Sequence, residues 1–211
     1  MGGNLGQSFG DLDDLGEVAP DGRHQRRENN RERVILAMAE LFADGSLVPT
    51  VAEVARRAEV SERSIFRYFR DVDDLTRAVI DVRIRGALPL ALIPHPRPVG
   101  LDERIGVLVD SRAALYEYLG PVARVIRARS VESPVIGEEM SRIRHVLRVQ
   151  EEGLFDAELG SFGPDRKTML LVLDVMTSFE SWELLRTDHS MEVASAKAVF
   201  VAGISRLLVG G

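Results

Sequence analysis

The chain has 211 residues, 45% of them apolar and 28% charged, which suits one large or two small packed domains. It has no cysteine, so disulfides and thiolate metal sites are excluded, and its four histidines never show i,i+4 spacing, so neither a metal nor a cofactor is expected. The net charge is −6, yet residues 23–70 carry ten arginines against seven acids; this excess favours a polyanionic partner only weakly, because ordinary solvated surfaces often show as much.

Residues 1–22 are rich in glycine and aspartate and contain no lysine or arginine. With no sustained apolar period, they are predicted to form a disordered acidic tail. The segment lacks the basic start and apolar run of a signal peptide, and no stretch of the chain approaches the roughly 18 apolar residues of a membrane helix. We therefore expect a cytoplasmic protein without a membrane partner.

Helical periodicity begins at about residue 23. One face of this first helix carries apolar residues at i, i+4, i+7 and i+8, and the helix is predicted to end at Asp44-Gly45; the apolar residues are Val34, Met38, Leu41 and Phe42.

Two short helices and a longer one are predicted next. Thr50 and Glu53 form a capping box that opens the first short helix, and Ser61 is a good N-cap for the second, which runs to about Tyr68. Asp71 then caps a helix that extends to about residue 92.

The second short helix divides into two faces. Ile65 and Phe69 point inward with Val60, whereas the opposite face carries Glu62, Arg63, Phe66, Arg67 and Arg70. Two short helices joined by a tight turn are the parts of a helix-turn-helix, whose second helix enters the major groove of DNA. Arginine there can bind guanine, worth about 1–3 kcal/mol of discrimination. The hydroxyls suited to phosphate oxygens belong to Thr50, Ser64 and Tyr68.

The run IPHPRPVG (93–100) holds three prolines and separates a helix-turn-helix domain, 23–92, from a second domain, 101–211. The second domain is also helical throughout. Its first predicted helix begins at Leu101 and ends at Gly120-Pro121. Three further helices are predicted over residues 122–129, 133–155 and 163–185. The last helix is expected to be capped by Ser190 and to end near Val209. The fold class is all-α with about nine helices.

The run TVAEVARRAEVSERSIFRYFRDVDDL (50–75) and the preceding RERVILAMAELFADG (31–45) resemble the DNA-binding segment of TetR-type transcriptional regulators. The specific part of the resemblance covers roughly residues 26–80. It implies DNA contacts at Thr50, Glu62, Arg63, Ser64, Phe66, Arg67 and Tyr68.

Three positions depart from the family pattern. Phe66 replaces a common tyrosine and loses its hydroxyl, and Glu59 replaces the usual glycine of the turn, which implies backbone strain or an altered turn. Val72 replaces a frequent lysine, and we expect Arg70 to supply the missing phosphate contact.

The resemblance also implies a homodimeric repressor that binds double-stranded DNA and a small-molecule effector. Dimerisation would use stripes on the last two predicted helices, although these could pack inside the monomer instead: Leu170, Leu173, Thr177, Ser181, Leu184, Ser195, Ala198, Ala202 and Ser205. Effector contacts are predicted among central residues, each of which also suits a core or surface role: Arg112, Tyr116, Arg129, Met140, Arg144, Met176, Phe179 and Trp182.

Two other functions are alternatives to a ligand-responsive regulator. An enzyme is disfavoured because the chain has no G-x-S-x-G, no P-loop, no H-E-x-x-H and no cysteine nucleophile. A helix-turn-helix protein that binds no effector, acting as an architectural or activating factor, would have a solidly packed second domain. A partly polar cavity among residues 101–185 would therefore favour the ligand-responsive reading.

Overall fold

The computed structural model describes residues 22–93, 100–130 and 134–209; the predicted acidic tail, apart from its last residue, and most of the proline-rich boundary lie outside them. These residues form ten α-helices, a 3-10 turn and a π turn, with no strand among them, so the predicted all-α fold is confirmed. In chain order the elements are α1 (Gly22–Ala43), α2 (Val51–Ala58), α3 (Glu62–Tyr68), α4 (Val72–Ala91), α5 (Leu101–Ser130), α6 (Pro134–Leu154), α7 (Asp156–Ser161), η1 (Gly163–Asp165), α8 (Arg166–Met176), α9 (Phe179–Glu183), η2 (Leu184–Asp188) and α10 (Val193–Val209).

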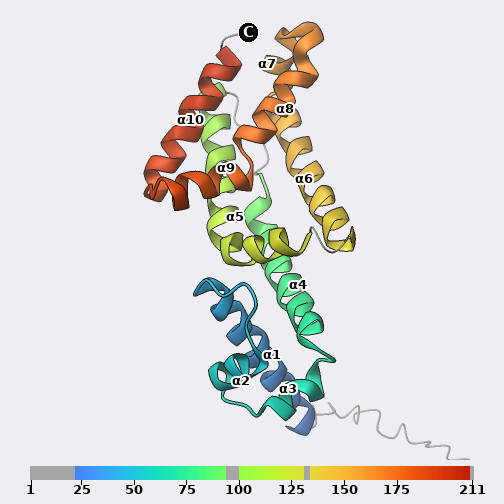
Figure 1. Cartoon of the computed structure of the whole chain (residues 1–211). Helices are drawn as coiled ribbons and strands as arrows, with labels where there is room; N and C mark the ends of the chain where they lie inside the picture. The colour runs from blue at the N-terminus through green and yellow to red at the C-terminus, as the bar shows by residue number, and fades with distance from the viewer. Residues whose placement is uncertain (1–21, 94–99, 131–133, 210–211) are drawn as a thin grey trace, which may run out of the picture.

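The helices gather at two ends of an elongated molecule, with α1 to α3 at one end and α6 to α10 at the other (Figure 1). Helix α4 leads from the first group to the second and packs along α5. No helix in the described part of the chain combines the length and apolar character that crossing a membrane requires.

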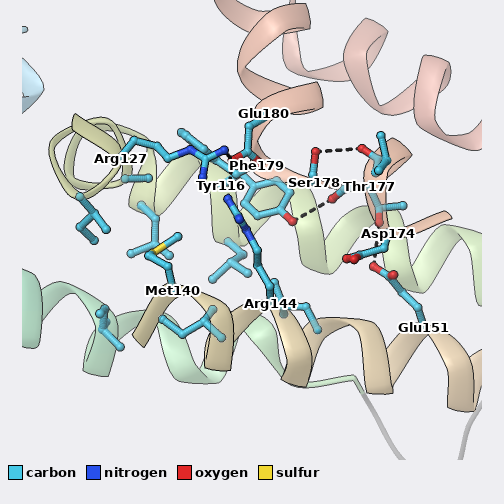
Figure 2. A pocket seen from close by; sticks show the side chains of 18 residues that line it. Tyr116, Arg127, Met140, Arg144, Glu151, Asp174, Thr177, Ser178, Phe179 and Glu180 are labelled. Carbon is cyan, nitrogen blue, oxygen red and sulfur yellow. Dashed lines mark hydrogen bonds and ion pairs between the residues drawn. The ribbon is translucent and has the colours of Figure 1, made fainter. Parts of the chain in front are cut away.

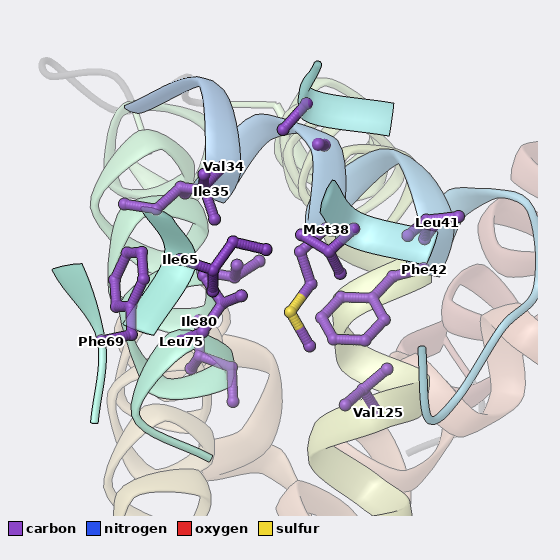
Figure 3. Packing of buried hydrophobic residues seen from close by; sticks show 14 of the residues in the cluster. Val34, Ile35, Met38, Leu41, Phe42, Ile65, Phe69, Leu75, Ile80 and Val125 are labelled. Carbon is purple, nitrogen blue, oxygen red and sulfur yellow. The ribbon is translucent and has the colours of Figure 1, made fainter. Parts of the chain in front are cut away.

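The N-terminal end is built around one apolar cluster, shown in Figure 3. Val34, Met38 and Phe42 line one face of α1, as their spacing predicts, and each is at most 1% exposed. Ile65 and Phe69 hold α3 against them at 3% exposure each. This packing fixes α3 by its inner face and leaves its outer face free for a partner.

Helix α5 runs through Gly120-Pro121, which corrects the prediction of two helices separated there. Its ribbon changes direction in the second half (Figure 1), as expected for a proline that lacks a backbone N–H. Beyond Pro121, Val122 and Val125 are buried in the N-terminal cluster. Burial against α1 therefore keeps this segment helical despite the local sequence.

The predicted helix over 163–185 is divided by the structure into η1, α8, α9 and part of η2. The break between α8 and α9 has a local cause: the Thr177 hydroxyl donates to the Leu173 carbonyl (2.9 Å), and Ser178 caps α9 by accepting from the Ser181 N–H (3.2 Å). Such side chains compete with the helical backbone for hydrogen bonds. Ser190 is not the cap of the last helix either, since it has φ 50° and α10 begins at Val193.

Candidate nucleic-acid interface and effector cavity

Capping side chains set where α2 and α3 begin. The Thr50 N–H donates to Glu53 Oε2 (2.8 Å) while the Glu53 N–H donates to Thr50 Oγ1 (3.3 Å), which completes the predicted capping box. The hydrogen bonds from Thr50 hold the pKa of the Glu53 carboxyl below its usual value. At α3, Ser61 Oγ accepts from the Ser64 N–H (3.2 Å).

The turn between the two helices passes through Glu59. Its backbone is left-handed, with φ 54° and ψ 44°, a region that side chains with a Cβ adopt at a cost. The Glu59 N–H bonds to the carbonyl of Arg56 and the Val60 N–H to that of Ala55, which closes α2. The strain predicted from the missing glycine is therefore present in the structure.

The outer face of α3 presents two arginines and an aromatic ring to solvent. Glu62, Arg63 and Arg67 are exposed, and Phe66 keeps 53% of its surface accessible although it is large and apolar. An exposed aromatic ring between two guanidinium groups is well suited to a groove lined by bases and phosphates, because arginine binds guanine and phosphate and an apolar ring can contact a thymine methyl group. The structure thus brings these four predicted DNA contacts onto one surface.

The remaining predicted DNA contacts are partly engaged within the protein. Tyr68 is half-buried and its hydroxyl accepts a hydrogen bond from Arg67, while Ser64 Oγ lies 2.8 Å from Ser61 Oγ. Arg70 Nη2 lies 3.3 Å from Asp74 Oδ1, and this cation lowers the pKa of Asp74. Because such an exposed pair is weak, Arg70 remains available to a phosphate.

A cavity of about 350 Å³ lies between α4, α5, α6, α8 and α9 (Figure 2). Its wall is mostly apolar and contains the side chains Leu115, Leu119, Ala123, Ile126, Ile143, Leu147 and Val175. Tyr116 and Phe179 meet edge to face there, with ring centroids 5.8 Å apart and an angle of 72° between the ring planes. Its size and lining match those of small-molecule sites.

Of the eight predicted effector contacts, four line this cavity: Tyr116, Met140, Arg144 and Phe179. Three do not line it: Arg112 and Trp182 are buried in the C-terminal core, and Met176 packs against Gly203 of α10. The side chain of Arg129 lies outside the described residues.

Arg112 instead belongs to a buried ion pair beside the cavity. Its Nη2 lies 3.2 Å from Glu151 Oε1, and the two side chains are 0% and 1% exposed. Glu151 Oε1 also accepts from the Thr177 hydroxyl (2.7 Å), and the Tyr116 hydroxyl donates to the Thr177 carbonyl (2.8 Å). Burial raises the pKa values of both Glu151 and Tyr116. This network links α5, α6 and the end of α8 at the cavity wall.

A second cluster of charged side chains lines the cavity, and these side chains are partly exposed to solvent. Arg127 of α5 and Arg144 of α6 both form ion pairs with Glu180 of α9, and the Arg144–Glu180 distance is 2.6 Å. Burial and the charge of Arg144 lower the pKa of Arg127. Sequence reasoning found Arg144 but missed Arg127 and Glu180, because no local pattern shows that three distant helices converge.

The predicted dimerisation residues fall into two groups. Leu173 and Thr177 are at most 1% exposed inside the protomer, which corrects their assignment as partner contacts. The other seven retain accessible surface: Leu170, Ser181, Leu184, Ser195, Ala198, Ala202 and Ser205. Close to them lie exposed apolar side chains that the prediction omitted, namely Leu171, Val172 and Val175 on α8 and Val199 on α10.

Comparisons with known proteins agree with this geometry. Residues 35–79, which span the last nine residues of α1, all of α2 and α3 and the first turns of α4, match the family described as bacterial regulatory proteins, tetR family. The fold is similar to the crystal structure of a transcriptional regulator from Rhodococcus sp. Rha1, at a TM-score of 0.65 and 17% identity. That likeness covers 85% of this chain and 96% of the other. No curated protein matches the sequence.

Proposed function

Because this chain belongs to the tetR family of bacterial regulatory proteins and is a DNA-binding regulator, we propose that it is a cytoplasmic homodimeric repressor that a small-molecule effector releases from a palindromic operator. The observation that carries the DNA-binding part is the outer face of α3. There Arg63, Phe66 and Arg67 are exposed while the inner face of the same helix is held by the core. This division is what insertion into the major groove requires.

The proposed dimer is supported by the apolar surface of α8 and α10. Val175 is 67% exposed and Val199 44%, beside the small residues Ser195, Ala198 and Ala202, which let two helices approach closely. A two-fold axis through this surface would pair it with itself. The pair would then present two copies of α3 to half-sites spaced about 34–36 Å apart.

The effector response rests on residues shared by the cavity and the N-terminal cluster. Ile84 of α4, Ile126 of α5 and Met140 of α6 line the cavity and also pack with the N-terminal cluster. A ligand that displaces them therefore changes the support of α1 to α4. Release needs a ligand that prefers the conformation with wrongly placed α3 helices, typically by about 1–3 kcal/mol.

The first test is selection of bound DNA from a random duplex pool. We expect enrichment of a palindrome, and Arg63→Ala should weaken binding and relax the preference at one base pair of each half-site. Gel filtration should give a dimer at micromolar concentration. Recovery of no palindrome, or a monomer, would contradict the proposal.

The second test addresses the effector. A thermal-shift screen of small molecules should find ligands that stabilise the protein and release the selected DNA. Ala123→Phe places a ring in the cavity and should abolish this stabilisation. A helix-turn-helix protein without an effector is the second candidate, and a screen in which Ala123→Phe and wild type respond alike would favour it.

A further inference from the structure

The first three turns of α1 extend beyond the core that the rest of the helix covers. Among the residues of α1 whose burial the structure describes, Val34 is the first that is fully buried, and the twelve residues from Gly22 to Arg33 form a helical extension about 18 Å long. The family match begins only at residue 35, so this extension lies outside it. Residues 25–29 are all exposed. A helix without an apolar face gains no stability from packing against a core, so its role must come from a different interaction.

The extension packs beside the C-terminal end of α3. Arg31 lies over the Phe69 ring, with its guanidinium carbon 5.2 Å from the ring centroid. The preceding residue, Asn30, also acts on the Tyr68 hydroxyl and contributes to lowering its pKa. Figure 1 shows the start of α1 next to α3 at the end of the molecule. The extension and the outer face of α3 therefore share one end of the molecule.

Positive charge is concentrated at this junction. Arg27 and Arg67 both act on the Tyr68 hydroxyl, one by charge and one by a hydrogen bond. Although burial favours the neutral phenol, the hydrogen bonds and these two charges bring the pKa of Tyr68 below its usual value. Guanidinium groups placed together repel one another, and an anion between them relieves the repulsion.

The arginines of the extension differ in their partners. Arg33 lies 3.0 Å from Glu59, and Arg31 lies 3.7 Å from Glu28. In the part of the chain that the structure describes, Arg26 and Arg27 form no such ion pair, although the extension also carries Glu28 and Glu32. An arginine without an acidic partner can bind a phosphate without first breaking an ion pair. Its binding also releases counterions from the DNA, which favours the complex.

We propose that the α1 extension is a second DNA-binding element, in which Arg26 and Arg27 contact phosphates that flank the base pairs facing α3. This rests on the proposed function, since it requires α3 to dock in the groove. It adds backbone contacts that position the protein without reading sequence. The operator footprint is then wider than the helix-turn-helix alone would cover.

The test uses the full-length protein and the operator obtained by selection. Arg26→Gln/Arg27→Gln removes two cations per protomer while keeping residues of good helix propensity. The matched control, Arg142→Gln/Lys167→Gln, removes the same charge from exposed positions on α6 and α8. Affinity is measured against salt concentration for each protein, on the full operator and on a duplex shortened by about five base pairs, half a helical turn, at each end.

The double variant on α1 should bind the full operator more weakly, with a salt slope shallower by about 3 to 4 for the dimer. Wild type and the α6/α8 control should lose affinity when the flanks are removed, whereas the α1 variant should bind both duplexes equally. Equal slopes for wild type and the α1 variant, or an equal loss on shortening, would overturn the inference while leaving the helix-turn-helix function intact. Failure of the wild type to bind any selected DNA would overturn both.

Discussion

The two cores of the molecule differ in what they bury. Among the described residues, the N-terminal end buries apolar side chains and Thr76 but no charged group, whereas the C-terminal end buries the charged side chains of Arg112 and Glu151 next to a cavity. A buried ion pair contributes little net stability, but losing the contact between its partners strongly lowers the free energy of unfolding, because a charge is then buried without compensation. We therefore expect the N-terminal core to supply stability and the C-terminal network to fix how α5, α6 and α8 surround the cavity.

The largest effect is expected from breaking that ion pair. Arg112→Met should lower the free energy of unfolding by about 3–5 kcal/mol, because it leaves the Glu151 carboxylate buried without its cation. Urea denaturation measures the change. The double variant Arg112→Met/Glu151→Met should recover much of the loss, and Arg57→Met, which removes exposed ion pairs with Glu40 and Asp44, should cost far less than Arg112→Met. Equal losses for Arg112→Met and Arg57→Met would remove the contrast between the two cores.

A smaller effect is expected at the end of α5, which belongs to the N-terminal core. Val125→Ala removes two buried methyl groups and should cost about 2 kcal/mol. Hydrogen exchange should show the loss of protection in α1 and α4, where the cluster lies. Val149→Ala, at a position 51% exposed on α6, serves as the control with little change. Loss of protection confined to α6–α10 would assign Val125 to the other core.

The capping box should contribute about 1 kcal/mol to the helix-turn-helix. Thr50→Ala removes the hydroxyl that accepts from the Glu53 N–H, so α2 should fray and the thermal midpoint should fall. Thr50→Ser keeps the hydroxyl and should stay close to wild type. If serine destabilised as much as alanine, the methyl group of Thr50 and not its cap would matter.

The smallest expected effect has the opposite sign. Glu59→Gly relieves the left-handed backbone and should raise the free energy of unfolding by about 0.5 kcal/mol, after the entropy of glycine is subtracted. Glu59→Gln keeps the strain and removes only the charge paired with Arg33. Urea denaturation of both variants separates the two contributions, and a destabilised glycine variant would show that the ion pair outweighs the strain.

The sequence predicted the N-terminal end well because its signals are local. The caps at Thr50, Ser61 and Asp71 each act within three residues, and all three are present. The inner residues of α3 are fixed by helical period alone. The family resemblance added the DNA partner, which periodicity does not identify.

The C-terminal end was predicted less well because its determinants are distant in sequence. Arg112 is neutralised by a carboxylate 39 residues later, so its burial has no local signature. The same holds for Arg127, whose partner Glu180 is on α9. Helix α5 continues through Pro121 because α1 covers its apolar side, a tertiary effect that outweighs the local Gly-Pro signal.

The bend of α5 has a consequence for exchanging parts between regulators. Val122, Val125 and Ile126 complete the core that α1 to α4 begin. The part of the protein that would have to be transferred together with the helix-turn-helix therefore consists of two segments that are not contiguous in sequence. A chimera joined at the proline-rich boundary would place one parent's α5 against the other parent's α1. Grafting this unit onto a different sensor therefore requires transplanting residues 122–126 together with 22–92.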